Sequence, residues 1–195
     1  MLVEVVGMAK HIGFPPRRGM TLIEILVTVA ILAIVLGLGI PSMREWMMKQ
    51  RVSSIAAELV TDLQLARSEA IRTNLQTSVK FNGNSAQTCY TIFTGTSFGG
   101  GCDCTKPLGT ACGASVTLKE VKTVSVLRDT GVTITANQTE KLLAGGVFST
   151  DVTPLVVSIS DGGNKALTVQ ASAFVQRPSV CVPSGSIMTG VHACP

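Results

Sequence analysis

Residues 17–24 read RRGMTLIE, and the apolar run that begins at Leu22 continues to Ile40 as LIEILVTVAILAIVLGLGI. Glu24 is the only ionisable side chain in this run. About 18 apolar residues in a helix, each rising about 1.5 Å, can cross the ~30 Å hydrocarbon core of a bilayer. A carboxylate inside such a run costs at least roughly 2.5–3.5 kcal/mol on insertion scales, so we expect Glu24 to have a function.

The basic residues Lys10, Arg17 and Arg18 precede the apolar run, and such flanks stay in the cytoplasm. We therefore expect a single pass through the bacterial inner membrane, with a cytoplasmic N-terminus and a periplasmic C-terminal part. One alternative is a secretory signal peptide, but its apolar region would span about 7–15 residues and end at a small-residue cleavage site. A plain single-span anchor is the other alternative.

Composition limits the classes of function. The formal net charge is +4, of which +2 belongs to residues 1–19, so the remaining chain carries only +2. This charge is too weak to indicate nucleic-acid binding, and one Trp and one Tyr do not provide a base-stacking platform. About 120 residues remain after the apolar helix, enough for one domain. Six cysteines indicate an oxidising compartment for that domain.

The junction between Gly19 and Met20 resembles the prepilin signature. The resemblance implies that a prepilin peptidase cleaves after Gly19 on the cytoplasmic side and methylates the amine of Met20. Most pilins begin with Phe, so Met20 is a departure of similar size and apolarity. Glu24 becomes the fifth mature residue, where pairing with the N-terminal ammonium of a neighbouring subunit would offset its burial and fix the axial register. A carboxylate neutralised near the lipid headgroups is the simpler alternative.

The chain resembles pilin N-terminal helices in carrying a proline at position 41. Pro41 lies 21 residues after Met20, and it follows Gly37 and Gly39. Glycine and proline are tolerated in membrane helices where neighbouring segments satisfy the backbone. We expect a kink or local unwinding between Gly37 and Pro41, with a simple break at the membrane edge as the alternative.

After Pro41 the pattern becomes that of an amphipathic helix. Apolar residues recur at three- and four-residue steps on one face: Val52, Ile55, Ala56, Leu59, Leu63, Ala66 and Ala70. The polar side is expected to hold Gln50, Arg51, Ser54, Asp62, Arg67 and Ser68. The pattern predicts a helix from about Thr21 to Thr73 or Asn74, whose second half packs on the strands that follow. It covers too few heptads for a coiled coil.

Residues 65–74 read LARSEAIRTN, and this stretch resembles the helix end of the GspH/FimT family of minor pilins and pseudopilins. The resemblance covers Arg18 to about Phe81 well and the later part of the chain only loosely. It implies a type IV pilin-like fold, in which the first half of a long N-terminal helix is transmembrane and the helix packs against an antiparallel β-sheet head.

From Gln76 onward the periodicity becomes two, with short runs rich in Val, Ile and Thr. The predicted strands are 76–81, 88–94, 116–127, 131–136, 145–150, 155–160 and 166–170, with a hairpin tip at 161–164. One helix followed by many strands indicates an α+β fold. We expect four segments: a leader at 1–19, a transmembrane and filament-core helix at 20–41, an amphipathic helix at 42–75, and an antiparallel head at 76–195. The glycines at 99–101 lack a following Lys and predict a loop rather than a nucleotide site.

The cysteines form two groups. Cys181 and Cys194 bracket the C-terminal tail, and their pairing would hold a terminus that otherwise frays; pilin heads resemble this in often closing a C-terminal loop with a disulfide. The other group comprises Cys89, Cys102, Cys104 and Cys112. Four thiols could form a zinc site, but the spacing lacks two Cys-x-x-Cys pairs, so we expect disulfides whose connectivity remains open. No metal or other cofactor is expected.

Catalytic machinery is not expected. His11 lies in the leader, and His192 is a histidine close to the chain end. Ser184 and Ser186 have no neighbouring base or oxyanion motif. The acidic residues Glu120, Asp129, Asp151 and Asp161 are scattered through predicted turns and strands, so we interpret them as solvated side chains rather than an acid–base pair.

The resemblance therefore implies a subunit of a type IV pilus or a type II secretion filament, with pilus biogenesis favoured by the tail closed by cysteines. Its expected partners are other pilins or pseudopilins, the prepilin peptidase and inner-membrane lipid. An alternative is a minor pilin that binds DNA during uptake, as some FimT-like proteins are thought to do with a basic stretch near the C-terminus. The corresponding residues 173–179 keep only Arg177, which cannot supply several phosphate contacts.

Overall fold

A computed structural model describes residues 19, 21–95, 101–114, 117–148, 153–171 and 177–195, without the side chains of residues 38–42. The chain divides into two compact units, Met1–Ser42 and Met43–Pro195, which are described separately. The glycines at 99 and 100, the first residue of the expected strand 116–127 and Asp151 lie outside the described residues.

The α-helix α1 extends from Leu22 to Thr73, close to the predicted bounds. Its first turn is capped by Thr21, whose carbonyl and hydroxyl oxygens accept the Glu24 amide at 3.1 and 3.3 Å. The residue directly after the helix, Asn74, has a positive φ of 51°. Asparagine tolerates this left-handed conformation better than most residues, and it commonly terminates helices there.

Helical backbone continues through Pro41 without interruption. Because the side chains of residues 38–42 lie outside the described set, a kink at Pro41 stays a prediction. No helix within the described part of the chain is long and apolar enough to cross a membrane. Met20, at the start of the expected transmembrane segment 20–41, also lies outside the described residues.

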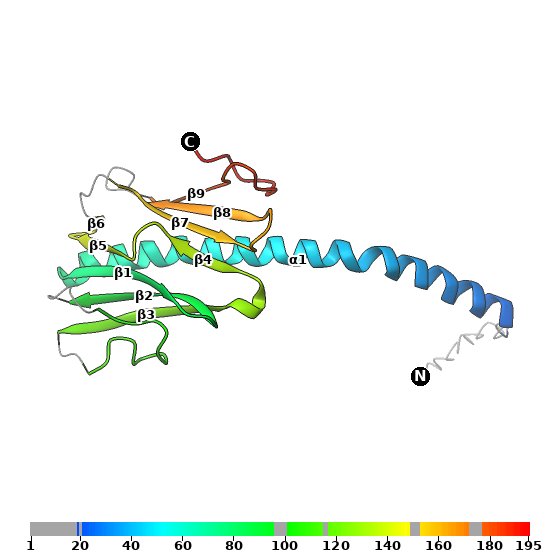
Figure 1. Cartoon of the computed structure of the whole chain (residues 1–195), viewed down its shortest axis with the longest axis horizontal. Coiled ribbons are helices and arrows are strands. Elements are labelled where there is room, and N and C mark those ends of the chain that lie inside the picture. Colours follow the sequence, from blue (N-terminus) through cyan, green and yellow to red (C-terminus); the bar gives the residue numbers. More distant parts are fainter. Residues whose placement is uncertain (1–18, 20, 96–100, 115–116, 149–152, 172–176) are drawn as a thin grey trace, which may run out of the picture. The chain divides into compact units, whose positions relative to one another are not determined.

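Two antiparallel sheets follow α1 (Figure 1). Sheet A has the order β3-β2-β1-β5-β6, with bounds Leu118–Leu127, Gln87–Gly95, Gln76–Gly83, Glu140–Ala144 and Val147–Phe148. Sheet B has the order β4-β7-β8-β9, with bounds Thr133–Ala136, Leu155–Ser160, Ala166–Ala171 and Ser179–Cys181. A short 3-10 helix, η1 (Arg128–Thr130), links β3 to β4. The predicted hairpin tip at 161–164 does connect β7 to β8.

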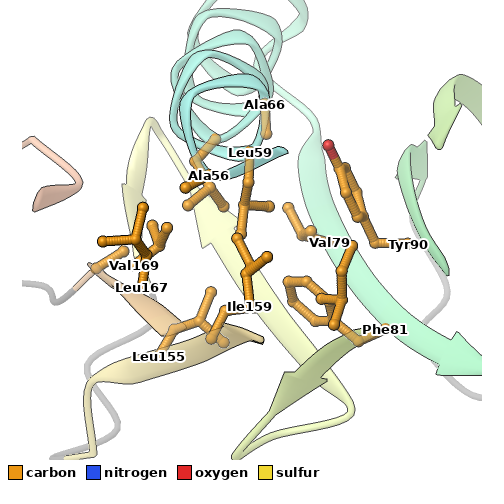
Figure 2. Packing of buried hydrophobic residues seen from close by; sticks show 14 of the residues in the cluster. Ala56, Leu59, Ala66, Val79, Phe81, Tyr90, Leu155, Ile159, Leu167 and Val169 are labelled. Carbon is orange, nitrogen blue, oxygen red and sulfur yellow. The ribbon is translucent and has the colours of Figure 1, made fainter. Parts of the chain in front are cut away.

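One hydrophobic core joins the second half of α1 to both sheets. Six of the seven predicted apolar positions on α1 are fully buried, and Ile55 is partly buried. Figure 2 shows the side chains of Ala56 and Leu59 directed toward Val79 of sheet A and Ile159 of sheet B. The fold is therefore α+β, as predicted, with a long helix packed against antiparallel sheets.

Some strand bounds differ from the prediction. β5 and β9 were not predicted. Of the expected strand 145–150, only Val147–Phe148 is a strand, because Gly145 and Gly146 form a turn with positive φ, and residues 149–150 lie outside the described residues. β4 begins at Thr133 rather than Gly131 because Gly131 caps η1 with a φ of 77°. Asp62 does not lie on the polar side of the helix as predicted, since it is 4% exposed.

Candidate assembly site

The predicted processing and assembly residues lie at the start of α1. Gly19 is exposed, and an added Cβ there would contact no other atom within 4 Å. Packing within the described residues therefore does not explain a glycine at this position. Met20, the expected mature N-terminus, lies outside the described residues.

Glu24 is exposed and occupies the first turn of α1. With Thr21 as the N-cap, Glu24 stands at the third helical position, which makes the Thr-x-x-Glu pattern of a capping box. A carboxylate at this end of the helix is also favoured by the helix dipole. The Thr-x-x-Glu pattern of residues 21–24 is visible in the sequence, but the role expected there for Glu24 is the pairing between subunits.

The described side chains from Leu22 to Gly37 are all exposed. Leu22 is 77% exposed, and the values for the other large apolar residues run down to 49% at Ile25 and Val27. A helix that is hydrophobic all round is normally buried in a protein core or in a membrane. The first part of α1 therefore requires an apolar environment that its own unit does not provide.

All six cysteines are paired in disulfides. The structure joins Cys181 to Cys194, which is the pair expected from the sequence. It resolves the open connectivity of the other four into Cys89–Cys104 and Cys102–Cys112. Since each of the six cysteine sulfurs is bonded to another, no cysteine thiolate remains to form the zinc site considered as an alternative.

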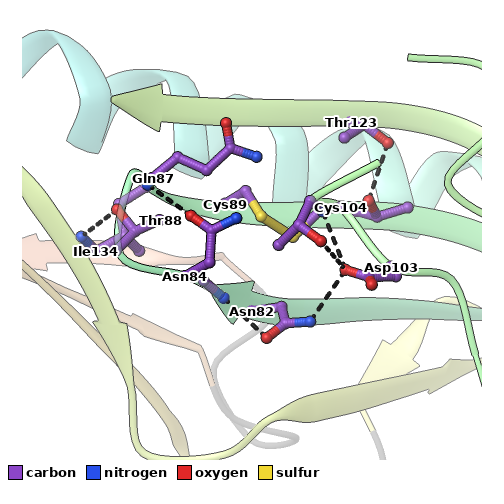
Figure 3. The surroundings of a disulfide bond; sticks show 12 residues. Asn82, Asn84, Gln87, Thr88, Cys89, Asp103, Cys104, Thr123 and Ile134 are labelled. Atoms are coloured by element: carbon purple, nitrogen blue, oxygen red, sulfur yellow. Dashed lines mark hydrogen bonds between the residues drawn. A yellow bond between two sulfur atoms is a disulfide. The ribbon is translucent and has the colours of Figure 1, made fainter. Parts of the chain in front are cut away.

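The Cys89–Cys104 disulfide holds residues 101–114 against the face of β2 that points away from α1, and Cys102–Cys112 closes this loop on itself. Cys102 and Ala111 are buried there against Phe93. Asp103 accepts hydrogen bonds from the amide and hydroxyl of Thr105 at 3.0 and 2.8 Å, and from Asn82 at 3.1 Å (Figure 3). The Thr105 amide, followed by its hydroxyl, lowers the pKa of Asp103 below its usual 3.8.

A charged network connects the other face of sheet A to α1. The buried Asp62 accepts the Tyr90 hydroxyl at 2.7 Å and pairs with Lys122 at 2.7 Å, and Lys122 also contacts Glu58 at 3.1 Å. Burial, followed by the hydrogen bond to Asp62, raises the pKa of Tyr90. Burial opposes the charged form of Lys122, but its hydrogen bonds to Asp62 and Glu58 outweigh that effect and raise its pKa.

The C-terminal tail folds back on sheet B. The Ser186 hydroxyl accepts a hydrogen bond from the Ala166 amide and donates one to the Ala166 carbonyl, both at 2.8 Å. Both of its hydrogen bonds are therefore made with the backbone of β8. His192 is exposed, and its carbonyl accepts the Val182 amide. Arg177 is exposed, whereas residues 173–176 of the region compared with a DNA-binding stretch lie outside the described residues.

Two of the acidic residues considered for catalysis have structural partners. Asp161 accepts the amides of Gly163 and Lys165 in the hairpin tip. Glu120 accepts the amides of Gly109 and Ala111 in the disulfide-bonded loop. These carboxylates hold loops in place and lie in different parts of the head, Asp161 in the turn between β7 and β8 and Glu120 in β3.

Two family models match the chain. Residues 15–40 match the prokaryotic N-terminal methylation motif, and residues 56–173 match type II transport protein GspH. Neither a curated protein nor a solved structure matches the chain.

A methylation motif, a long helix and an antiparallel head define a type IV pilin-like subunit. The chain belongs to the GspH family, whose model covers more than half of it. This is a family of structural subunits rather than enzymes. Membership implies processing by a prepilin peptidase, assembly with other pilins or pseudopilins, and an inner-membrane anchor with a periplasmic head.

Proposed function

We propose that this chain is a minor subunit of a type IV pilus or type II secretion filament that assembles through α1 once residues 1–19 have been removed. The observation that carries the proposal is the exposed apolar stretch Leu22–Leu36, which lies within the methylation motif matched at residues 15–40 and has Glu24 in its first turn. Residues 20–41 form the membrane-embedded and filament-core helix, residues 42–75 its amphipathic continuation, and residues 76–195 the head.

The proposed function gives the exposed apolar side chains two successive environments. Before assembly they lie in inner-membrane lipid, crossing it once, and in the filament they pack against the helices of neighbouring subunits. At about 25 cal/mol per Å² of buried apolar surface, either environment is strongly favoured over water. A kink at Pro41 would allow the helix to adapt to both.

Glu24 sets the register in this proposal. Its carboxylate pairs with the N-terminal ammonium of Met20 in an adjacent subunit, in an environment of low dielectric constant. Unpaired, a buried carboxylate is costly, so subunits displaced along the filament axis are disfavoured. The Thr-x-x-Glu pattern within its own helix can be kept by a neutral Gln at this position, whereas the ion pair requires a charge, and this difference permits a test.

The test compares Glu24→Gln with Glu24→Ala in cells that assemble the filament. Glutamine keeps the capping box, since Gln serves at this position, but it cannot form the ion pair. We expect both variants to be processed, to accumulate in the membrane and to be depleted from purified filaments. Glu45→Ala, which removes an exposed carboxylate further along α1, is the matched control and should assemble normally. Wild-type incorporation of Glu24→Gln would contradict the pairing.

The choice between the two machines rests on the C-terminal disulfide. A tail closed by Cys181 and Cys194 favours the pilus, because pilin heads often close a loop in this way. Deleting the gene should then remove surface pili while leaving secreted enzymes at normal levels. The reverse result would assign the chain to secretion.

DNA capture during uptake is the second candidate function, and the exposed Arg177 is the residue of the compared stretch that would contact phosphate. One exposed arginine supplies few phosphate contacts, so the expected affinity is low and weakly dependent on salt. Duplex DNA titrated with the detergent-solubilised chain at two salt concentrations tests this candidate. Saturable binding lost in Arg177→Ala would support it.

A further inference from the structure

The outer edge of sheet A is formed by its longest strand. β3 has ten residues and ends the strand order of the sheet, so β2 is its one neighbour among the described strands (Figure 1). An edge strand presents unpaired N–H and C=O groups that can pair with another extended chain. Edge strands are commonly short, whereas the ten residues of β3 offer backbone hydrogen-bonding groups along the whole length of a partner strand.

Two hollows follow this edge on the side of α1. The first, of about 390 Å³, is lined by Ile55 and Glu58 of the helix and by residues 124–127 of β3. The second, of about 730 Å³, is lined by Glu69 and Arg72 near the end of α1 and by residues 118–121 of β3. Lys122 lies between these two parts of β3, where it reaches across to Asp62. A hollow therefore borders β3 at each end of the strand.

The two ends differ in chemistry. At the first hollow, Ile55 and Val124 are partly buried and Leu127 is 49% exposed, so the lining is mainly apolar. At the second hollow, both carboxylates already have partners, because Glu69 binds Arg72 and Glu120 binds loop amides. Lys119 is exposed and has no side-chain partner among the described residues. This end therefore has a cation available for a carboxylate.

We propose that β3 binds an extended segment of a partner protein as an additional strand of sheet A. The segment has apolar side chains at the end beside Leu127 and an acidic side chain at the end beside Lys119. These two residues are eight positions apart on β3, but the bulge between Lys122 and Glu120 leaves seven steps between their partners on β2. A regular partner strand of about eight residues, roughly 23 Å long, therefore spans them. Backbone hydrogen bonds supply affinity and the two end contacts supply specificity, as in other cases of strand addition.

The test uses the full chain in detergent micelles, immobilised and exposed to a phage library of random eight-residue peptides. We expect selected peptides to alternate, with apolar residues at one end and Asp or Glu at the other. The Lys119→Glu variant should select Lys or Arg at that end and weaken the wild-type peptide about five-fold. Leu127→Ser should remove the apolar preference. Both positions are exposed, so neither substitution should change the melting temperature.

Peptide backbone chemistry distinguishes strand addition from adhesion of side chains. Methylating the peptide amides at one set of alternate positions should abolish binding, and methylating the other set should leave it intact, because only one set faces β3. The proposal would be overturned by a lack of any selected peptides, by equal tolerance of both methylated sets, or by dimers of the chain itself that Leu127→Ser disrupts. Glu24→Gln should bind the peptide normally, so this test is independent of the assembly test.

Discussion

The buried carboxylate of Asp62 on α1 accepts hydrogen bonds from both Tyr90 and Lys122, and these bonds connect the helix to sheet A. Removing one member of a buried charged group leaves the others without partners, which costs more than the contact itself gains. Glu58 binds the same lysine but is 44% exposed, so solvent can replace it.

We therefore expect Asp62→Ala to lower the free energy of unfolding by about 2–4 kcal/mol. Glu58→Ala should lower it by less than about 1 kcal/mol. Urea denaturation of both variants, followed by circular dichroism, measures the difference. Equal losses for the two variants would show that the network does not depend on the buried carboxylate.

Asp103 makes the stability of the disulfide-bonded loop at 101–114 depend on pH in the acid range. Because its folded pKa lies below the usual 3.8, its stabilising effect is complete above that pH and is lost as the pH falls through the folded value. Lys122 acts in the opposite direction, since its raised pKa means that its contribution is lost as the pH rises above 10.5.

Proteolysis of the loop between pH 5 and pH 2 tests the contribution of Asp103. The wild-type chain should become more susceptible to cleavage at residues 105–110 only at the acid end of this range. The Asp103→Asn variant should be susceptible throughout and show a flatter profile. An unchanged acid dependence in the variant would assign the effect to other carboxylates.

The sequence could predict some of these residue roles but not others. Apolar spacing located the buried face of α1, yet it placed Asp62 among the polar residues because helical periodicity does not show which charges find partners. Those partners, Tyr90 and Lys122, come from β2 and β3, far along the chain. The Thr21 and Glu24 pair could have been found, since a capping box is a local pattern.

At the scale of elements, the missed strands have physical reasons. β5 reads EKLLA, which consists of residues that favour helices, and it becomes a strand by pairing with β1. β9 has three residues and directly follows Pro178, so it is too short to show a period of two. In both cases tertiary pairing overrides a weak local preference.

The tail disulfide provides a prediction at this scale. Cys181 and Cys194 are separated by 13 positions, and closing a loop of that size stabilises the folded state by about 3 kcal/mol in the chain-entropy account. The double variant Cys181→Ser, Cys194→Ser should lose about that much stability. Thermal melting measures it, with reductant added to the wild type as a comparison. An unchanged melting temperature would mean that the tail contributes nothing to the head.

At the scale of the whole molecule, two features visible in the sequence determine the fold and the family. An apolar helix with a conspicuous carboxylate and a strand-rich remainder indicated a helix packed on an antiparallel head. The division of the strands into two sheets and the pairing of four cysteines required the structure, because strand order and disulfide connectivity depend on long-range contacts. The same applies to the open edge of β3.

In the proposed function, the chain is processed before Met20 so that α1 can enter a filament. Mass spectrometry of the N-terminal peptide, taken from the protein purified out of cell membranes, tests this claim most directly. We expect a chain that starts at Met20 with one methyl group on its amine, and a Gly19→Phe variant that keeps residues 1–19. A mature chain that begins at any other residue, or an unmethylated and uncleaved wild type, would contradict it.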